Sequence, residues 1–370
     1  MAKALQKESF PLVQLVSKHA GKILRSYSER IDIVIPVYNA PVLTRRCIDS
    51  VIAHLGESIH KILIHDDASD SETRAMLDHL PYPCAEVLHA EKNEGFGMAV
   101  NMAVNRSDAD YIFILNSDTE VKHNILPLLC SAFHADPKLA AIVPTGNSYD
   151  NFDLTRYALY PGNYIRNYYL RGHAFLIRRD IFLAIGGFDP IFGRGYYEDI
   201  DLGRRLDLNG WRFGIHPEAY IYHKRGGSFG NNRRSLSRRN RAVYLARYPK
   251  AQQNVLLLTT SHTLIHLDTK LISTIDQIFH DGGYVHWFTP ERTNQLACLQ
   301  MYNHNLNIYS IVRTILRGWK RTDRRVTEIW IAMEVPFLLR TLLTAWGKWR
   351  NLKVLLFKQT TRPDSFTESG

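Results

Sequence analysis

The segment YIFILNSD, residues 111–118, decides the fold class of this 370-residue chain. Its first five residues, Tyr111–Leu115, are mostly apolar and are bounded by polar residues, which is typical of a short buried strand. The run then ends in Asn116, Ser117 and Asp118. Ligands of α/β proteins bind beyond the carboxyl ends of the sheet strands. We therefore expect a ligand site at Asp118.

Strand-like and helix-like stretches alternate on both sides of this segment, which predicts parallel βαβ units in a doubly wound, mostly parallel sheet. The expected strands are Ile31–Val37, Lys61–His65, Ala85–His89, Ala140–Val143, Arg171–Arg178, Arg212–Ile215 and Ala219–Tyr222. The expected helices begin at Pro41, Ser71, Gly95, Asn124, Arg179 and Tyr197. Residues 147–167 are rich in Asn, Tyr, Asp and Gly, which favours a long functional loop.

Three regions follow from this pattern. Residues 1–30 place Leu12, Val16, Ala20 and Ile23 on one stripe of an amphipathic N-terminal helix. Residues 31–247 form the α/β domain. Residues 248–370 are expected to be a helical, basic appendage, because residues 308–319 keep a regular helical stripe with arginines off it. This appendage would contact a membrane surface or pack against the α/β domain or a second subunit.

Composition sets the class of protein. Hydrophobic residues make up 45% of the chain and charged residues 22%, as in globular proteins. The four cysteines are scattered, which argues for a reducing compartment and against a disulfide framework or a structural zinc. We see no secretory signal and no apolar run long enough to span a bilayer. The expected location is cytoplasmic or peripheral to the inner face of a membrane.

The net charge of +10 is unevenly distributed. From His223 to the end there are 23 Lys and Arg against 9 Asp and Glu, so the excess positive charge lies there. Such asymmetry indicates an anionic partner, namely a membrane surface, a lipid diphosphate or a nucleic acid. A solvated basic surface without a partner is the alternative.

Two polar motifs follow the early strands. Asp66 and Asp67 come directly after a strand, where a carboxylate can accept an N–H from a pyrimidine base. Residues 93–101, NEGFGMAVN, combine two glycines with the start of a helix, and glycines let the backbone approach a ligand closely. Helix capping and a tight strand-to-helix turn are the structural alternatives for these motifs.

Three later groups carry candidate chemistry. Asn116 and Asp118 offer amide and carboxylate oxygens, which hard divalent cations prefer. Glu198 and Asp199 open a helix after a glycine-rich, aromatic approach, and a carboxylate there could deprotonate a hydroxyl group. His223 ends a short strand, and a lone histidine is more often structural than a ligand, but the neighbouring basic and glycine residues add weight to a metal or diphosphate role.

Together these motifs resemble the family 2 inverting glycosyltransferases of the GT-A fold, and particularly the rhamnosyltransferase-like members that build bacterial surface polysaccharides. The resemblance covers residues 31–228. Its motifs, in chain order, are IVIPVYN at 33–39, DDASD at 66–70, NEGFGMAVN at 93–101, LNSD at 115–118, GHAFLIRR at 172–179, GGFDPIF at 186–192, YEDIDLGRRL at 197–206 and GW at 210–211.

The resemblance implies a role for each group. Asp199 would be the catalytic base with Glu198 beside it, and Asp118 would hold Mg²⁺ or Mn²⁺ with help from His223. Asn116 replaces the first acid that many members carry, which puts the strength of metal binding in doubt. The nucleotide and donor would meet Pro36, Tyr38, Asn39, Asp66, Asp67, Asn93, Gly95, Asn101, Asn116 and Ser117. The donor sugar or acceptor would meet Gly172, His173, Asp189 and Trp211.

The resemblance thus implies a metal-assisted transferase that moves a sugar from a UDP- or dTDP-sugar to a hydroxyl of a glycan, itself attached to a lipid. An anionic membrane surface and a homodimer are the further partners considered. Nucleic acid is not expected, because a polyanion binder would avoid acids at 66, 118 and 199. The alternatives are an inactive GT-A scaffold, a membrane- or polyanion-binding adaptor, and a nucleotidyltransferase. The last would want a glycine-rich, basic loop after the first strand, which residues 38–41 do not provide.

Overall fold

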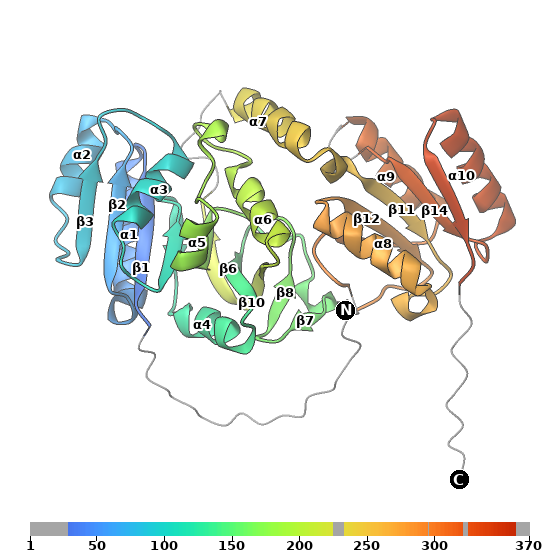
Figure 1. Cartoon of the computed structure of the whole chain (residues 1–370), viewed down its shortest axis with the longest axis horizontal. Coiled ribbons are helices and arrows are strands. Elements are labelled where there is room, and N and C mark those ends of the chain that lie inside the picture. The colour runs from blue at the N-terminus through green and yellow to red at the C-terminus, as the bar shows by residue number, and fades with distance from the viewer. Residues whose placement is uncertain (1–28, 225–232, 295, 321–324, 360–370) are drawn as a thin grey trace, which may run out of the picture.

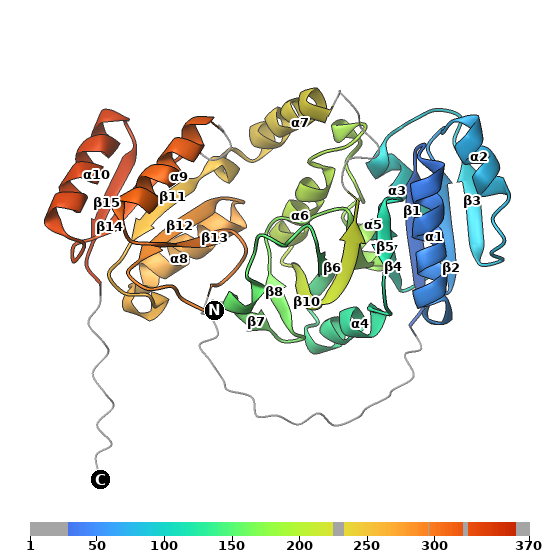
Figure 2. The same ribbon diagram turned by 180° about the vertical axis from the view of Figure 1, so that it is seen from behind.

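The computed structural model describes residues 29–224, 233–294, 296–320 and 325–359. The N-terminal helix predicted for residues 1–30 therefore lies outside the described residues, except for its last two positions. Within the described part, two α/β units lie side by side, each with its own sheet (Figures 1 and 2).

The first unit contains a ten-stranded mixed sheet among the described residues, in the order β3-β2-β1-β4-β9-β6-β10-β8-β7, with β5 paired to β10. Its strands are β1 (Ile31–Val37), β2 (Lys61–Asp66), β3 (Ala85–His89), β4 (Tyr111–Leu115), β5 (Thr119–Val121), β6 (Leu139–Gly146), β7 (Leu159–Tyr160), β8 (Tyr164–Arg166), β9 (Ala174–Arg178) and β10 (Arg212–His223). Its helices are α1 (Pro41–Leu55), α2 (Ser71–Asp78), α3 (Phe96–Asn105), α4 (Leu126–Ala135), α5 (Arg179–Ala184) and α6 (Glu198–Leu208), and α7 (Arg233–Arg247) leads to the second unit.

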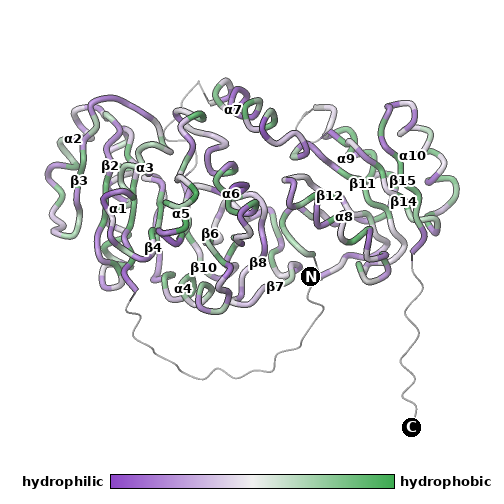
Figure 3. Tube along the Cα trace, in the orientation of Figure 1, coloured by the Kyte–Doolittle hydropathy of each residue, from purple (hydrophilic) through white to green (hydrophobic). Residues whose placement is uncertain are grey.

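The predicted strands at the start of the chain are confirmed, and β1, β2 and β4 are buried on both faces of the sheet, whereas β3 is a half-buried edge strand. In β1, Val34 belongs to one hydrophobic core, whereas Ile33 and Ile35 belong to the core on the opposite face. A strand covered on both faces reads as a continuous apolar run, and this is how β1 and β4 appear in the sequence. Figure 3 shows hydrophobic stretches along the strands of both sheets.

Three details of the first unit differ from the sequence-based expectation. The strands expected at 212–215 and 219–222 form the single strand β10, which has register shifts against β6. Strand β9 runs antiparallel between β4 and β6, so the sheet changes direction there. The region expected to be a loop, residues 147–167, contains the short strands β7 and β8.

The prediction of a helical appendage was wrong. Residues 254–357 form a second α/β unit with a five-stranded parallel sheet, in the order β13-β12-β11-β14-β15. Its elements are β11 (Asn254–Leu258), α8 (Thr269–His280), β12 (Tyr284–Thr289), β13 (Met301–Asn305), α9 (Ile308–Lys320), β14 (Glu328–Ala332), α10 (Phe337–Trp349) and β15 (Lys353–Phe357). The expected helical stripe of residues 308–319 is present as α9. The strands were missed because runs such as NVLLL and EIWIA are too short to show a helical or strand period.

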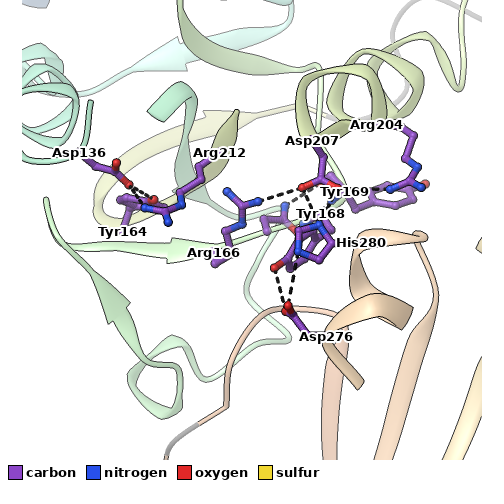
Figure 4. Close-up of polar contacts among 11 residues, drawn as sticks. Asp136, Tyr164, Arg166, Tyr168, Tyr169, Arg204, Asp207, Arg212, Asp276 and His280 are labelled. Atoms are coloured by element: carbon purple, nitrogen blue, oxygen red, sulfur yellow. Dashed lines mark hydrogen bonds and ion pairs between the residues drawn. The ribbon is translucent and has the colours of Figure 1, made fainter. Parts of the chain in front are cut away.

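A buried polar cluster joins the two units (Figure 4). On the first unit, Arg166 of β8 contacts Asp207 of α6 at 3.0 Å, and both side chains are 5% exposed. His280, at the end of α8, approaches Asp207 at 2.9 Å and Asp276 at 3.6 Å. The ring of Tyr168 stacks on Phe279 at 6.1 Å. Buried charges are tolerated when they are paired in this way.

This cluster makes the stability of the joined units depend on pH. Burial lowers the pKa of His280, but hydrogen bonds and charge interactions with Asp207 and Asp276 outweigh it and raise the pKa from 6.5 to about 9. Folding therefore strengthens proton binding, so the stabilisation is complete below pH 6.5 and is lost as the pH rises through about 9. We expect the thermal unfolding midpoint to fall across this range, and to fall less in His280→Gln. Equal slopes for the two proteins would contradict this assignment.

Candidate active site

The site lies at the carboxyl ends of the first-unit strands, in a cavity of about 1610 Å³ that also reaches the second unit. Parallel strands β1, β2 and β4 end at this edge, where α/β proteins bind their ligands. The structure brings together in this cavity seven of the predicted site residues: Asn116, Asp118, Gly172, His173, Glu198, Asp199 and His223.

Asp118 and His223 form a pair on neighbouring strand ends. Antiparallel pairing sets His223 of β10 opposite Thr119 of β5, one residue after Asp118. The Nε2 atom of His223 lies 3.1 Å from an oxygen of Asp118. Asn147 fixes the backbone of His223 from both sides, because its side chain donates to the carbonyl and accepts from the N–H, each at 2.9 Å. His173 stacks on His223 with ring centroids 4.8 Å apart.

The donor atoms near this pair fit a divalent cation. Asn116 Oδ1 and His223 Nδ1 are buried and make no hydrogen bond within the described residues. Buried polar atoms are normally bonded, so atoms left without a partner at a cavity indicate a missing ligand. Carboxylate and amide oxygens suit Mg²⁺, and an additional imidazole suits Mn²⁺ as well.

A second group of possible metal ligands lies at the opposite edge of the sheet. Asp32, His60 and Asp108 have ligand atoms within 4.8 Å of one another. Asp32 is the second residue of β1, so it sits at the amino end, away from the cavity. Its carboxylate already bonds His60 at 3.0 Å and accepts from the Ser107 hydroxyl at 2.5 Å. Asp108 pairs with Arg30 at 2.7 Å. These contacts engage the ligand atoms of Asp32 and Asp108, so the group has a structural role.

Glu198 and Asp199 begin α6 and face the same cavity. Asp199 accepts hydrogen bonds from the backbone N–H groups of Gly172 at 2.8 Å and Ile200 at 2.9 Å. Burial raises the pKa of Asp199, whereas these bonds and nearby Arg171 oppose the rise. Burial and the charge of Asp199 raise the pKa of Glu198 well above its usual range. Asp199 therefore ionises before Glu198, and a carboxylate with a raised pKa is a stronger base.

The backbone that leads to this acid pair is held in an uncommon conformation. Tyr196 and Tyr197 have φ angles of 70° and 74°, in the left-handed region that bulky residues rarely occupy. The fully buried Asn240 of α7 stabilises this turn, because its side-chain amide donates to the carbonyls of Phe192 at 2.6 Å, Gly195 at 2.7 Å and Tyr196 at 3.0 Å. Strained backbone of this kind is often found where a functional group must be positioned. Asn240 could not be predicted from the sequence, since an asparagine in a basic helix carries no local signal.

Removing the Asn240 amide should loosen the acid pair. We expect Asn240→Ala to lower the free energy of unfolding by about 1–3 kcal/mol, because buried carbonyls lose their donor. We also expect it to lower kcat by about tenfold or more, since small displacements of a catalytic group slow the reaction strongly. Arg238→Ala, at an exposed position of the same helix, is the control. An unchanged kcat in Asn240→Ala would contradict a positioning role.

The residues predicted to bind the nucleoside do not line this cavity, with the exception of Asn116. Asp66 is fully buried, and its carboxylate already approaches His89 at 2.6 Å and accepts from Ser69 N–H at 2.9 Å. Asp67 accepts from the N–H groups of Glu94 and Gly95 at 2.7 and 2.8 Å. Both carboxylates thus hold the loops at this edge together. Base binding by Asp66 stays a prediction.

Several other predicted residues also have structural contacts. Asn101 makes two hydrogen bonds to the backbone of Phe188, at 2.8 and 2.9 Å. Asp189 pairs with Arg247 at 2.9 Å, and Trp211 packs half-buried against the core. At Gly95, with φ 95°, an added Cβ would lie 2.4 Å from Arg194 Cα, so only glycine fits that turn. Donor or acceptor binding by these residues stays a prediction.

Comparison with known proteins agrees with this architecture. Residues 32–191 match Glycosyl transferase family 2. The glycosyltransferase GlyG of Streptococcus pneumoniae serotype 4 is 30% identical over 131 residues, which are 34% of this chain and 41% of GlyG. An N-acetylglucosaminyl-diphospho-decaprenol L-rhamnosyltransferase of Mycobacterium tuberculosis is 26% identical, over 50% of this chain and 73% of that protein. A mannosyltransferase structure from Pyrobaculum calidifontis aligns with a TM-score of 0.44 at 17% identity, over 61% of this chain and 62% of that one.

The first of the curated relatives are thus matched over less than half of their own length. The matched segment of this chain covers β1 to the end of α5 and the turn that follows, and it contains Asp118 and the loops around it. Over residues 32–191, the first α/β unit of this chain is therefore similar to glycosyl transferase family 2.

Proposed function

We propose that this protein is an inverting glycosyltransferase that moves a sugar from a UDP- or dTDP-sugar to a hydroxyl group of a glycan acceptor during surface-polysaccharide synthesis. The observation that carries the proposal is the position of Asp199, whose raised pKa suits a base, in one cavity with the pair Asp118 and His223. Matches to the rhamnosyltransferase and to the succinoglycan biosynthesis protein ExoO of Rhizobium meliloti support the polysaccharide context.

The proposed reaction is a single displacement. Asp199 accepts the proton of the acceptor hydroxyl while the oxygen attacks the anomeric carbon from the face opposite the leaving diphosphate. Asp118, His223 and Asn116 would hold Mg²⁺ or Mn²⁺ at the other side of the reacting sugar, and a cation there supplies charge stabilisation to the departing nucleoside diphosphate. One displacement needs one base, so Glu198 can remain protonated beside Asp199.

We also propose that the acceptor is linked to a lipid and that the protein binds to the surface of an anionic membrane. The second unit exposes large apolar side chains on two helices, among them Tyr309 and Trp319 on α9 and Phe337 and Trp349 on α10. Basic residues lie among them, including the exposed Arg313 of α9. Within the described residues, no helix is both long and apolar enough to cross a bilayer. Sedimentation with anionic vesicles, compared with the oligomeric state in solution, separates membrane binding from a homodimer.

A donor panel tests the transferase proposal. The purified protein is incubated with UDP- and dTDP-sugars plus Mn²⁺, and release of nucleoside diphosphate is followed. We expect release with one donor or a small set of donors. No release, together with no donor binding by calorimetry, would instead favour an inactive scaffold or an adaptor.

A further inference from the structure

The second unit supplies one wall of the cavity, and this wall is a ladder of aromatic rings. Tyr284, His286 and Phe288 alternate along β12 and face Tyr302 and His304 of the neighbouring strand β13. Consecutive rings stack across the two strands: Tyr284 on Tyr302 at 6.0 Å, Tyr302 on His286 at 5.2 Å, His286 on His304 at 5.3 Å and His304 on Phe288 at 4.9 Å. Four of these residues line the cavity, namely Tyr284, His286, Tyr302 and His304.

This ladder is connected to the candidate catalytic centre by further ring contacts. From His223 the series runs to His173 at 4.8 Å, then to Tyr149 at 6.5 Å, Phe152 at 6.3 Å and Tyr302 at 6.3 Å. Phe152 comes from the first unit and Tyr302 from the second, so the series crosses between the units. The result is an aromatic track from the Asp118–His223 pair to the second sheet, in which His173, Phe152 and Tyr302 line the cavity and Tyr149 is buried away from it.

Cationic side chains accompany the track. The guanidinium of Arg171 lies 4.4 Å from the ring centroid of Tyr149 and 6.0 Å from that of Phe152. Farther along, Arg156 reaches across to the Asn303 side chain at 2.6 Å, and Arg317 of α9 lines the same end of the cavity. Asp153 is the acid that lines this end, and its carboxylate accepts from the Thr155 hydroxyl at 2.5 Å.

The charge at this end is positive at neutral pH. Burial lowers the pKa of His304 to about 4, and the positive charges of Arg317, Arg313, Arg156 and Arg292 add to the effect. His304 is therefore neutral and offers its ring nitrogens as hydrogen-bonding groups, as the 3.0 Å contact between His286 Nδ1 and His304 Nε2 shows. Of these arginines, Arg156 and Arg317 line the cavity, and together they outweigh the charge of Asp153.

The size of the cavity also calls for a second occupant. Typical ligand pockets measure about 300–1,000 Å³, and this cavity of about 1610 Å³ is larger. The Tyr hydroxyls and His nitrogens along the ladder present polar edges on apolar rings, a combination that suits sugar rings with their hydroxyl groups and apolar C–H faces. Except for Asn116, the residues predicted to bind the nucleotide do not line the cavity.

We propose that the ladder of β12 and β13, together with Arg317, is the binding subsite for the non-reacting part of the acceptor, and that this part is an acidic oligosaccharide. Its negative group, a carboxylate or a phosphate, would lie at Arg317, and its sugar units would follow the aromatic track toward Asp199. This inference rests on the proposed function, since it assigns the acceptor of that same reaction. It makes the second unit an acceptor-binding domain rather than only a packing partner.

The test measures retention of oligosaccharides by the full-length protein in the presence of UDP and Mn²⁺. The probes are three sets of bacterial oligosaccharides: uronic-acid-containing, phosphodiester-linked and neutral. We expect one acidic set to be retained more strongly than the neutral set, which also identifies the negative group. Tyr302→Ala should weaken retention of the preferred set at least tenfold, and Tyr302→Phe should weaken it less. Arg317→Gln should weaken the acidic set about tenfold and leave the neutral set unchanged.

Arg350→Gln, on an exposed residue after α10, is the matched charge control. Donor affinity measured by calorimetry reports whether each variant keeps its fold. If the wild type binds donor but retains no oligosaccharide, or if retention survives Tyr302→Ala, the acceptor assignment is overturned while the transferase proposal stands. Equal retention of the neutral and acidic sets would overturn the acidic class. A failure of the donor panel, by contrast, would count against the proposed function itself.

Discussion

We expect Asp199→Asn to lower kcat by about two to four orders of magnitude, the usual contribution of a general base. The substitution keeps the shape of the side chain and removes its ability to take a proton. The affinity for the donor should change little, because Asp199 contacts the acceptor hydroxyl in the proposed reaction. Steady-state kinetics with the preferred donor, together with donor calorimetry, separate these two effects.

Glu198→Gln is the matched control for this prediction. Burial and the charge of Asp199 raise the pKa of Glu198 well above its usual range and so favour its neutral form, which the neutral amide resembles. We expect a small effect on kcat, within about fivefold, set against the loss of two orders or more in Asp199→Asn.

The pH profile gives a second readout for the same base. Activity should rise with pH as Asp199 loses its proton, and the raised pKa places this limb above the range of an ordinary aspartate. A larger loss of kcat in Glu198→Gln than in Asp199→Asn would make Glu198 the general base and Asp199 its neighbour. Normal activity in both variants would remove the acid pair from the mechanism.

The sequence was informative where burial leaves a local pattern. Strands β1 and β4 begin and end where their apolar runs do, because a strand covered on both faces admits few polar residues. Polar residues at the ends of these strands then indicated the edge that carries the site. Asp118, Asp199 and His223 were predicted separately, and the sheet brings them into one cavity.

The missed features depend on contacts between distant segments. Asn240 donates hydrogen bonds to carbonyls that lie more than forty residues earlier in the chain, and the sequence of its own helix does not indicate these contacts. The ring ladder of β12 and β13 exists only when the two strands pair in parallel register. The Asp66 carboxylate has the right position in the sequence for a ligand, yet its contact with His89 buries it, and only the three-dimensional packing decides between these uses.

Asp118→Ala is expected to lower kcat by about two to three orders of magnitude, because it removes the carboxylate nearest to the proposed site of the leaving diphosphate. Glu120→Gln is the matched control, since Glu120 lies two residues away on β5 and pairs with Lys122 at 2.5 Å. The variant should also lose the dependence of residual activity on added Mn²⁺, whereas the control keeps it.

Asn116→Asp tests the same assignment in the opposite direction. The side-chain oxygen of Asn116 is buried and makes no hydrogen bond within the described residues, so a second carboxylate at this position would face the cation directly. We expect the Mn²⁺ concentration for half-maximal activity to fall by about tenfold, since added ligand charge strengthens the binding of hard cations. Full activity of Asp118→Ala in the presence of a chelator would show that the diphosphate leaves without a cation at this position. The arginines of the cavity would then be the groups that stabilise the departing charge.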